Sequence, residues 1–182
     1  MANFIDKSYF RADIMLPKGE YDNIETHIAR FEKEVLTYLL GYELHTALVA
    51  GAAVEPYKSL LNGKVYEISQ NGKTKKVKWN GLKNTDLSSL IGYYVYCEYL
   101  RNQVLSIQQV GAVFSKQENS NIASVNGKIF SAWASFEELY GYYGQNPLIP
   151  SAYNYLTKHK DLPEFECWEF TSLRGSINSH DL

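Results

Sequence analysis

The stretch LIGYYVYCEYL, residues 90–100, decides the fold expected for this chain. Only Gly92 and Glu98 interrupt its apolar and aromatic positions, so a helix built from it is hydrophobic on almost every side. Such a helix is stable in water only when other elements cover most of its surface. The stretch therefore predicts the central helix of a bundle, running from about Asp86 to about Gln109, with Thr85 or Asp86 as N-cap and Gly111 beyond its end.

Helical patterns recur on both sides of this central segment. Residues 22–40 place one apolar stripe at spacings of three and four, and Gly41 is a typical residue after a helix C-terminus; the stripe is Ile24, Ile28, Phe31, Val35 and Leu39. Further helices are predicted within residues 42–50, 55–61, 121–144 and 151–160, whereas residues 1–20 read as extended or irregular. We therefore predict a mainly α fold, a helical bundle with a long central helix and one inserted β-hairpin.

The hairpin is predicted from residues 64–79, KVYEISQNGKTKKVKW. Asn71-Gly72 is the favoured pair for a two-residue type I′ turn, because both positions need a positive φ. Counting outward from this turn places Glu67 opposite Lys76 and Tyr66 opposite Val77. One face then carries Tyr66, Ile68, Val77 and Trp79, and it needs a cover, since a lone hairpin is marginally stable in water.

The bulk composition limits the classes of protein to consider. A length of 182 residues suits one domain, and a net charge of −2 from 18 basic and 20 acidic side chains gives none of the basic surplus of nucleic-acid binders. Cys97 and Cys167 show no metal-ligand spacing and are interpreted as small hydrophobic residues in a reducing compartment. The most apolar run is too short and too rich in tyrosine to span a bilayer, so we expect a soluble, non-secreted chain without membrane contact.

A search for catalytic motifs identifies no site. The sequence has no glycine-rich phosphate loop, HExxH, GxSxG or EF-hand pattern, and we predict no catalytic residue, no cofactor and no metal site. His27 and His45 are interpreted as residues on helix surfaces. Glu32 and Glu34 do not share a helix face at that spacing, which favours a solvated surface over an acid/base pair. An enzyme remains open, since a fold can gather distant residues.

The hairpin lysines are the one local charge feature, and they are the candidate partner contacts: Lys73, Lys75, Lys76 and Lys78. They are suited to a phosphate backbone or an acidic protein surface. Lysines on an exposed strand also serve to keep its edge soluble and unpaired.

Tyrosine is unusually abundant, with 15 residues in the chain and clusters in YYVYCEY and YGYYG. This residue is enriched in protein interfaces because it combines a large contact area with a polar group. It also lines the outer core of helical domains, and both interpretations are open.

Several segments follow one another in a recognisable order: FIDKSYF, EVLTYLLGYEL, KWNGLKNTDLSSLIGYYVYCEYLRN, QENSN and AWASFEELYGYYG. This order resembles a group of phage and prophage proteins of Bacteroidetes, the head–tail connector or adaptor proteins of tailed bacteriophages. The resemblance covers about residues 1–160, and it divides the chain into a helical connector-like domain, residues 1–160 with the hairpin at 64–79, and a C-terminal tail, residues 161–182. The tail is expected to be partly an extended aromatic strand and partly mobile.

The resemblance implies a structural virion protein without enzymatic activity. Its copies would form a ring, commonly of about twelve, beneath the portal protein and extend the DNA channel toward tail or stopper proteins. DNA would pass through the lumen without sequence readout. The protein would reside in the host cytoplasm before assembly and in the virion neck afterwards, and no functional residue is carried over from the family.

Two alternatives belong to other classes. A small helical enzyme or ligand-binding domain predicts a pocket in which polar groups converge. A DNA-binding protein predicts salt-sensitive binding through the hairpin lysines.

Overall fold

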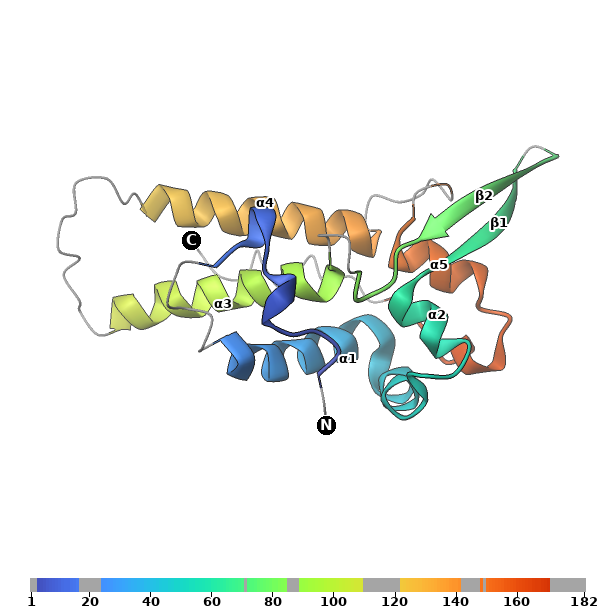
Figure 1. Cartoon of the computed structure of the whole chain (residues 1–182), viewed down its shortest axis with the longest axis horizontal. Coiled ribbons are helices and arrows are strands. Elements are labelled where there is room, and N and C mark those ends of the chain that lie inside the picture. The colour runs from blue at the N-terminus through green and yellow to red at the C-terminus, as the bar shows by residue number, and fades with distance from the viewer. Residues whose placement is uncertain are drawn as a thin grey trace.

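The computed structural model describes residues 3–16, 24–70, 72–84, 89–109, 122–141, 148 and 150–170. Three long helices lie side by side in one layer, with α3 between the other two (Figure 1). Shorter helices and a two-stranded antiparallel hairpin gather at one end of this layer. The elements are α1 (Ile24–Gly51), α2 (Tyr57–Asn62), β1 (Lys64–Gln70), β2 (Lys73–Trp79), α3 (Leu90–Gln109), α4 (Ile122–Tyr140) and α5 (Ala152–Lys158). The predicted fold class is confirmed: the protein is mainly helical with one inserted hairpin.

Helix α3 is the central helix that the sequence predicts. Its residues 90–97 are all buried, between α1 on one side and α4 on the other. The tyrosines of YYVYCEY line the core, so the outer-core interpretation is confirmed for this cluster. The Ser89 hydroxyl caps the helix by accepting a hydrogen bond from the Gly92 N–H at 3.0 Å. The predicted caps Thr85 and Asp86, and Gly111 beyond the C-terminal end, lie outside the described residues.

Helix α1 runs over 28 residues but is interrupted at Gly41, whose φ of 75° and ψ of 166° are not helical. The predicted stop at this glycine and the predicted second, shorter helix after it are therefore confirmed as two helical segments joined by a kink. The stripe predicted for the first segment is buried along its whole length. Among the described helices, none is both long and apolar enough to cross a membrane.

The N-terminal segment, residues 3–16, packs across the helices and contains two short 3₁₀ turns, η1 (Lys7–Tyr9) and η2 (Ala12–Ile14). Glu32 of α1 anchors it, since its carboxylate accepts hydrogen bonds from the backbone N–H groups of Phe4 at 2.8 Å and Ile5 at 2.9 Å. The prediction of a solvated surface is wrong for Glu32, which is 6% exposed. Its burial is tolerated because the backbone donors replace water.

Residues 161–170 also pack on the core, although not as the predicted strand. They contain the 3₁₀ helix η3 (Pro163–Phe165), and both Phe165 and Trp168 are buried. The indole N–H of Trp168 donates to the Leu39 carbonyl of α1 at 2.9 Å. The segment is therefore held by the burial of two large aromatic side chains, and not by the backbone hydrogen bonds of a strand. The remainder of the predicted tail, residues 171–182, lies outside the described residues.

Candidate functional site

The hairpin pairs in the register that the sequence predicts. Glu67 lies opposite Lys76 and Tyr66 opposite Val77. Gly72 has a φ of 72°, the left-handed conformation that a type I′ turn requires, while Asn71 lies outside the described residues. The turn residues and the two-residue alternation were therefore sufficient to determine which side chains share a face.

The base of the hairpin, the half nearest the helices, is fixed by aromatic packing. Trp79 stacks on Tyr155 of α5 with ring centroids 5.5 Å apart, and its indole N–H donates to the Leu60 carbonyl of α2 at 3.1 Å. Tyr66 meets the same Tyr155 ring edge-on at 5.6 Å. These contacts supply the cover that the apolar face needs. They join both strands to α2 and α5.

Two glycines allow the strands to enter and leave this base. Gly63 precedes β1 with a φ of 91°, and Gly81 follows β2 with a φ of 88°. A Cβ atom on Gly63 would collide with the backbone of Trp79 and Asn80, and one on Gly81 with the backbone of Leu61. Glycine is therefore needed at both positions for two reasons: the backbone has a positive φ, and another backbone segment passes too close for a side chain. The direction of the hairpin is set by this crossing.

The candidate lysines lie along β2, with Lys73, Lys75 and Lys76 in its outer half and Lys78 next to Trp79 at the base. All four are exposed, and the outer half of the hairpin extends away from the helical body (Figure 1). Lys73 and Lys75 continue the face that is buried at the base, whereas Lys76 and Lys78 lie on the opposite face beside Val65, which is 55% exposed. The structure thus places the lysines on one strand but divides them between both faces. The result is a cationic projection and not a single flat patch.

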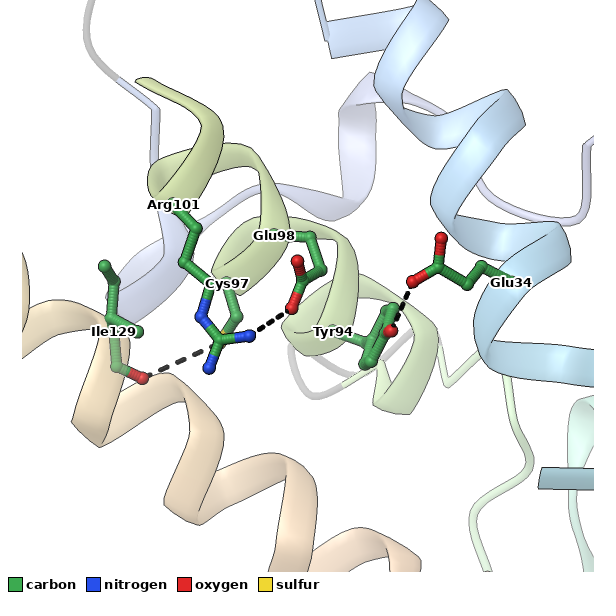
Figure 2. Close-up of polar contacts among 6 residues, drawn as sticks. All are labelled: Glu34, Tyr94, Cys97, Glu98, Arg101 and Ile129. Carbon is green, nitrogen blue, oxygen red and sulfur yellow. Dashed lines mark hydrogen bonds and ion pairs between the residues drawn. The ribbon is translucent and has the colours of Figure 1, made fainter. Parts of the chain in front are cut away.

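A second group of polar side chains links the three long helices (Figure 2). The Tyr94 hydroxyl of α3 donates to the Glu34 carboxylate of α1 at 2.8 Å. Burial and this hydrogen bond raise the pKa of Tyr94, so the phenol stays protonated. Arg101 forms an ion pair with Glu98 at 2.6 Å and lies over the Trp133 ring of α4. The Tyr94–Glu34 hydrogen bond joins α3 to α1, and the Arg101–Trp133 contact joins α3 to α4. This structural role accounts for the presence of these polar side chains.

The two cysteines differ in their surroundings. Cys97 is buried, its thiol lies 3.6 Å from the Ile129 carbonyl oxygen of α4, and burial raises its pKa to about 12 (Figure 2). A thiol of that pKa is a poor nucleophile at neutral pH, in agreement with its interpretation as a small hydrophobic residue. The same interpretation is wrong for Cys167, which is exposed.

The histidines that were assigned to helix surfaces are only half exposed. His27 packs against Phe31 and Tyr99, and burial, with a contribution from Arg30, lowers its pKa. His45 shares a hydrogen bond with the Thr37 hydroxyl at 3.0 Å, and burial lowers its pKa as well. Across the described part of the chain, no three His, Cys, Asp or Glu side chains are grouped as metal ligands.

Exposed aromatic side chains on the outer helices were not identified from the sequence. Tyr42 on α1 is 76% exposed, and Phe130 on α4 is 56% exposed. Both lie off the apolar stripes of their helices, and that position is the signal that could have identified them. Each of the two helices that flank α3 therefore carries an exposed aromatic side chain.

Comparison with known proteins adds no relative, since no family model, no curated protein and no solved structure matches this chain.

Proposed function

We propose that this protein is a structural subunit of the neck of a tailed bacteriophage, a head–tail connector or adaptor that works through protein contacts and not through catalysis. Its copies form a ring beneath the portal protein and extend the DNA channel toward tail or stopper proteins. DNA passes through the lumen without sequence readout. The observation that carries the proposal is the hairpin, which has a rigid base and a cationic projecting tip.

The anchoring of the hairpin supports a role in binding. A projection that moves freely loses entropy when it docks, whereas one held by the stacking of Trp79 on Tyr155 is already oriented. Lys73, Lys75 and Lys76 are exposed in the outer half of the hairpin, away from the aromatic packing at its base. They are therefore available to contact a neighbouring surface.

The outer helices supply further surfaces for assembly. A ring requires two different surfaces on each subunit, because one patch contacts a different patch on the next copy. The exposed Tyr42 of α1 and Phe130 of α4 lie on the two helices that flank α3 (Figure 1). Large aromatic side chains on two separate helices agree with this requirement. The order of segments that resembles phage connectors supports the same class.

The exposed lysines also favour a second candidate, a DNA-binding protein. Neutralisation of several phosphates would make its affinity fall by orders of magnitude between about 50 and 200 mM salt. A connector that lines a channel contacts DNA only weakly and without sequence preference. Equilibrium binding to duplex DNA over this salt range separates the two candidates.

The proposal is tested by deletion of the gene from the phage or inducible prophage that encodes it. We expect DNA-filled heads that lack tails, or heads that leak DNA, and recovery of infectious particles when the wild-type gene is supplied in trans. Electron microscopy of the particles and plaque counts are the measurements. Normal infectious particles without the protein would reject the connector function.

A further inference from the structure

We infer that the cationic hairpin of one copy binds an acidic segment, residues 161–170, of a second copy of this chain. This inference rests on the proposed function for the closure of such contacts into a ring. The contact itself is argued from charge, exposure and placement within the described residues.

The two surfaces have opposite charges of equal size. The hairpin, residues 64–79, contains five lysines and one glutamate, a net charge of +4. Residues 161–170 contain four acidic side chains and no basic one, a net charge of −4: Asp161, Glu164, Glu166 and Glu169. The chain as a whole carries only −2, so both segments depart from its average. Opposite potentials of this kind steer association and select orientation.

Both surfaces are accessible and combine charge with apolar area. Val65 is 55% exposed on the same hairpin face as Lys76 and Lys78, and Phe170 is 39% exposed next to Glu169. An interface between copies would remove both apolar side chains from water. Charge would then provide the orientation, and apolar burial a favourable contribution to binding.

The acidic segment is held rigidly enough to act as a docking surface. Trp168 is fixed by its hydrogen bond to Leu39, and the Phe170 ring packs against Tyr153 at 4.9 Å and Tyr140 at 5.3 Å. Asp161, Glu166 and Glu169, which precede or lie between these anchors in the chain, remain exposed. The backbone that carries these carboxylates is therefore held in one arrangement, while the carboxylates themselves stay exposed.

The placement of the two surfaces favours a contact between copies over one within a copy. The hairpin tip points away from the helical body (Figure 1), whereas Phe165 and Trp168 of the acidic segment are buried in that body. The stacking of Trp79 on Tyr155 and the close crossing at Gly63 and Gly81 hold the hairpin in this direction. When one patch contacts a different patch on the next copy, each end of the resulting chain of copies keeps one patch unoccupied. Such a chain closes into a ring when the rotation between neighbouring copies divides a full turn evenly.

The test uses two charge-reversed forms of the full-length protein. The first carries Lys73→Glu, Lys75→Glu and Lys76→Glu, so its hairpin is acidic. The second carries Asp161→Lys, Glu166→Lys and Glu169→Lys, so its C-terminal segment is basic. Wild-type protein, each variant and an equal mixture of both are treated with a zero-length carbodiimide cross-linker at low salt. A mixture of ¹⁴N- and ¹⁵N-labelled protein identifies by mass which cross-links join two copies.

Wild-type protein should give cross-links between copies from the hairpin to residues 161–170. Each variant alone should lose at least about 90% of that yield, because like charges now face each other, and the mixture should restore it through alternating copies. High salt should reduce the yield in wild type and mixture alike. Thermal unfolding of each variant within a few degrees of wild type shows that folding is intact.

Three results would overturn the inference: no cross-links between wild-type copies at these sites, undiminished cross-linking of either variant, or no restoration in the mixture. Loss of DNA or portal binding in the hairpin variant, with cross-linking between copies unchanged, would assign the hairpin to that other partner instead. Gene deletion separates this inference from the proposed function. Tailless heads on deletion, with normal assembly by the hairpin variant, would reject only the contact, whereas restored cross-links with a dispensable gene would reject only the neck function.

Discussion

The base and the tip of the hairpin belong to the same two strands but have different surroundings. At the base, Trp79 and Tyr66 pack on α5, and Gly63 and Gly81 permit a close backbone crossing. At the tip, Lys73, Lys75 and Lys76 are exposed to solvent, and a Cβ atom on Gly72 would meet nothing within 4 Å. The difference indicates that the base is selected for folding, whereas the tip is free to be selected for binding. Substitutions in matched pairs can test this division.

The largest effect is expected for Trp79→Ala at the base. The substitution removes a side chain that is 1% exposed, its stacking on Tyr155 and its hydrogen bond to Leu60, and it leaves a cavity. Loss of a large buried aromatic side chain costs about 3–5 kcal/mol of the free energy of unfolding. Chemical denaturation measures it, and Thr74→Ala, at an exposed position of the same strand, serves as control. A loss below about 1 kcal/mol would show that the base does not belong to the core.

A sharper comparison uses two glycines that both have a positive φ. Gly81 has a φ of 88° at the base and Gly72 a φ of 72° at the tip, so alanine is strained at both. Only at Gly81 does the new Cβ atom also meet backbone, that of Leu61. Gly81→Ala should therefore destabilise by about 2–3 kcal/mol and Gly72→Ala by about 1 kcal/mol. Equal losses of stability in the two variants would mean that the crossing at the base is not tight.

The division between base and tip also explains what the sequence could predict. Register follows from local information, because the Asn71-Gly72 turn and the alternation of side chains are contained within residues 64–79. The burial of α3 follows from its own composition. The lysines were identified as candidates, but their separation onto two faces at a projecting tip depends on where the helical body ends, which no local pattern encodes.

Long-range contacts account for the remaining errors. Glu32 is buried because residues 3–16 fold over α1 and provide two backbone N–H donors. The sequence around position 32 contains no signal for these donors. Likewise, residues 161–170 adopt their turn because Trp168 reaches the Leu39 carbonyl, 129 positions away in the chain. In both cases a contact with a residue distant in the sequence determines the local structure or burial, and local propensity does not.

Glu32 is a buried ionisable group, and its effect on stability can be compared with that of the exposed lysines at the tip. Burial raises the pKa of its carboxyl group, although the N–H groups of Phe4 and Ile5 oppose the rise. The folded state therefore holds the proton more tightly than the unfolded state, so this group stabilises the fold fully below its unfolded pKa. That contribution is lost as the pH rises through the folded pKa.

The measurement compares wild type with Glu32→Gln by denaturant unfolding at several pH values between about 4 and 7. The advantage of wild type over the variant should shrink as the pH rises. Glu43→Gln is the control for an exposed carboxylate on the same helix. A difference in stability that does not change with pH, or that grows as the pH rises, would contradict the assigned direction of the pKa shift.

The smallest effect on stability is expected for the joint substitution of Lys73, Lys75 and Lys76 by serine. Exposed side chains away from caps and cores usually change the free energy of unfolding by less than about 1 kcal/mol, so the melting temperature should stay within a few degrees of wild type. Incorporation into particles should nevertheless fall, because the tip loses the charge that orients it on a partner. A matched variant, with Lys33, Lys58 and Lys128 replaced by serine, removes the same charge from exposed positions elsewhere and should assemble normally. If both variants assemble alike, the tip contributes only solubility and its binding role is rejected; if the hairpin variant alone unfolds, the tip belongs to the fold and the comparison itself fails.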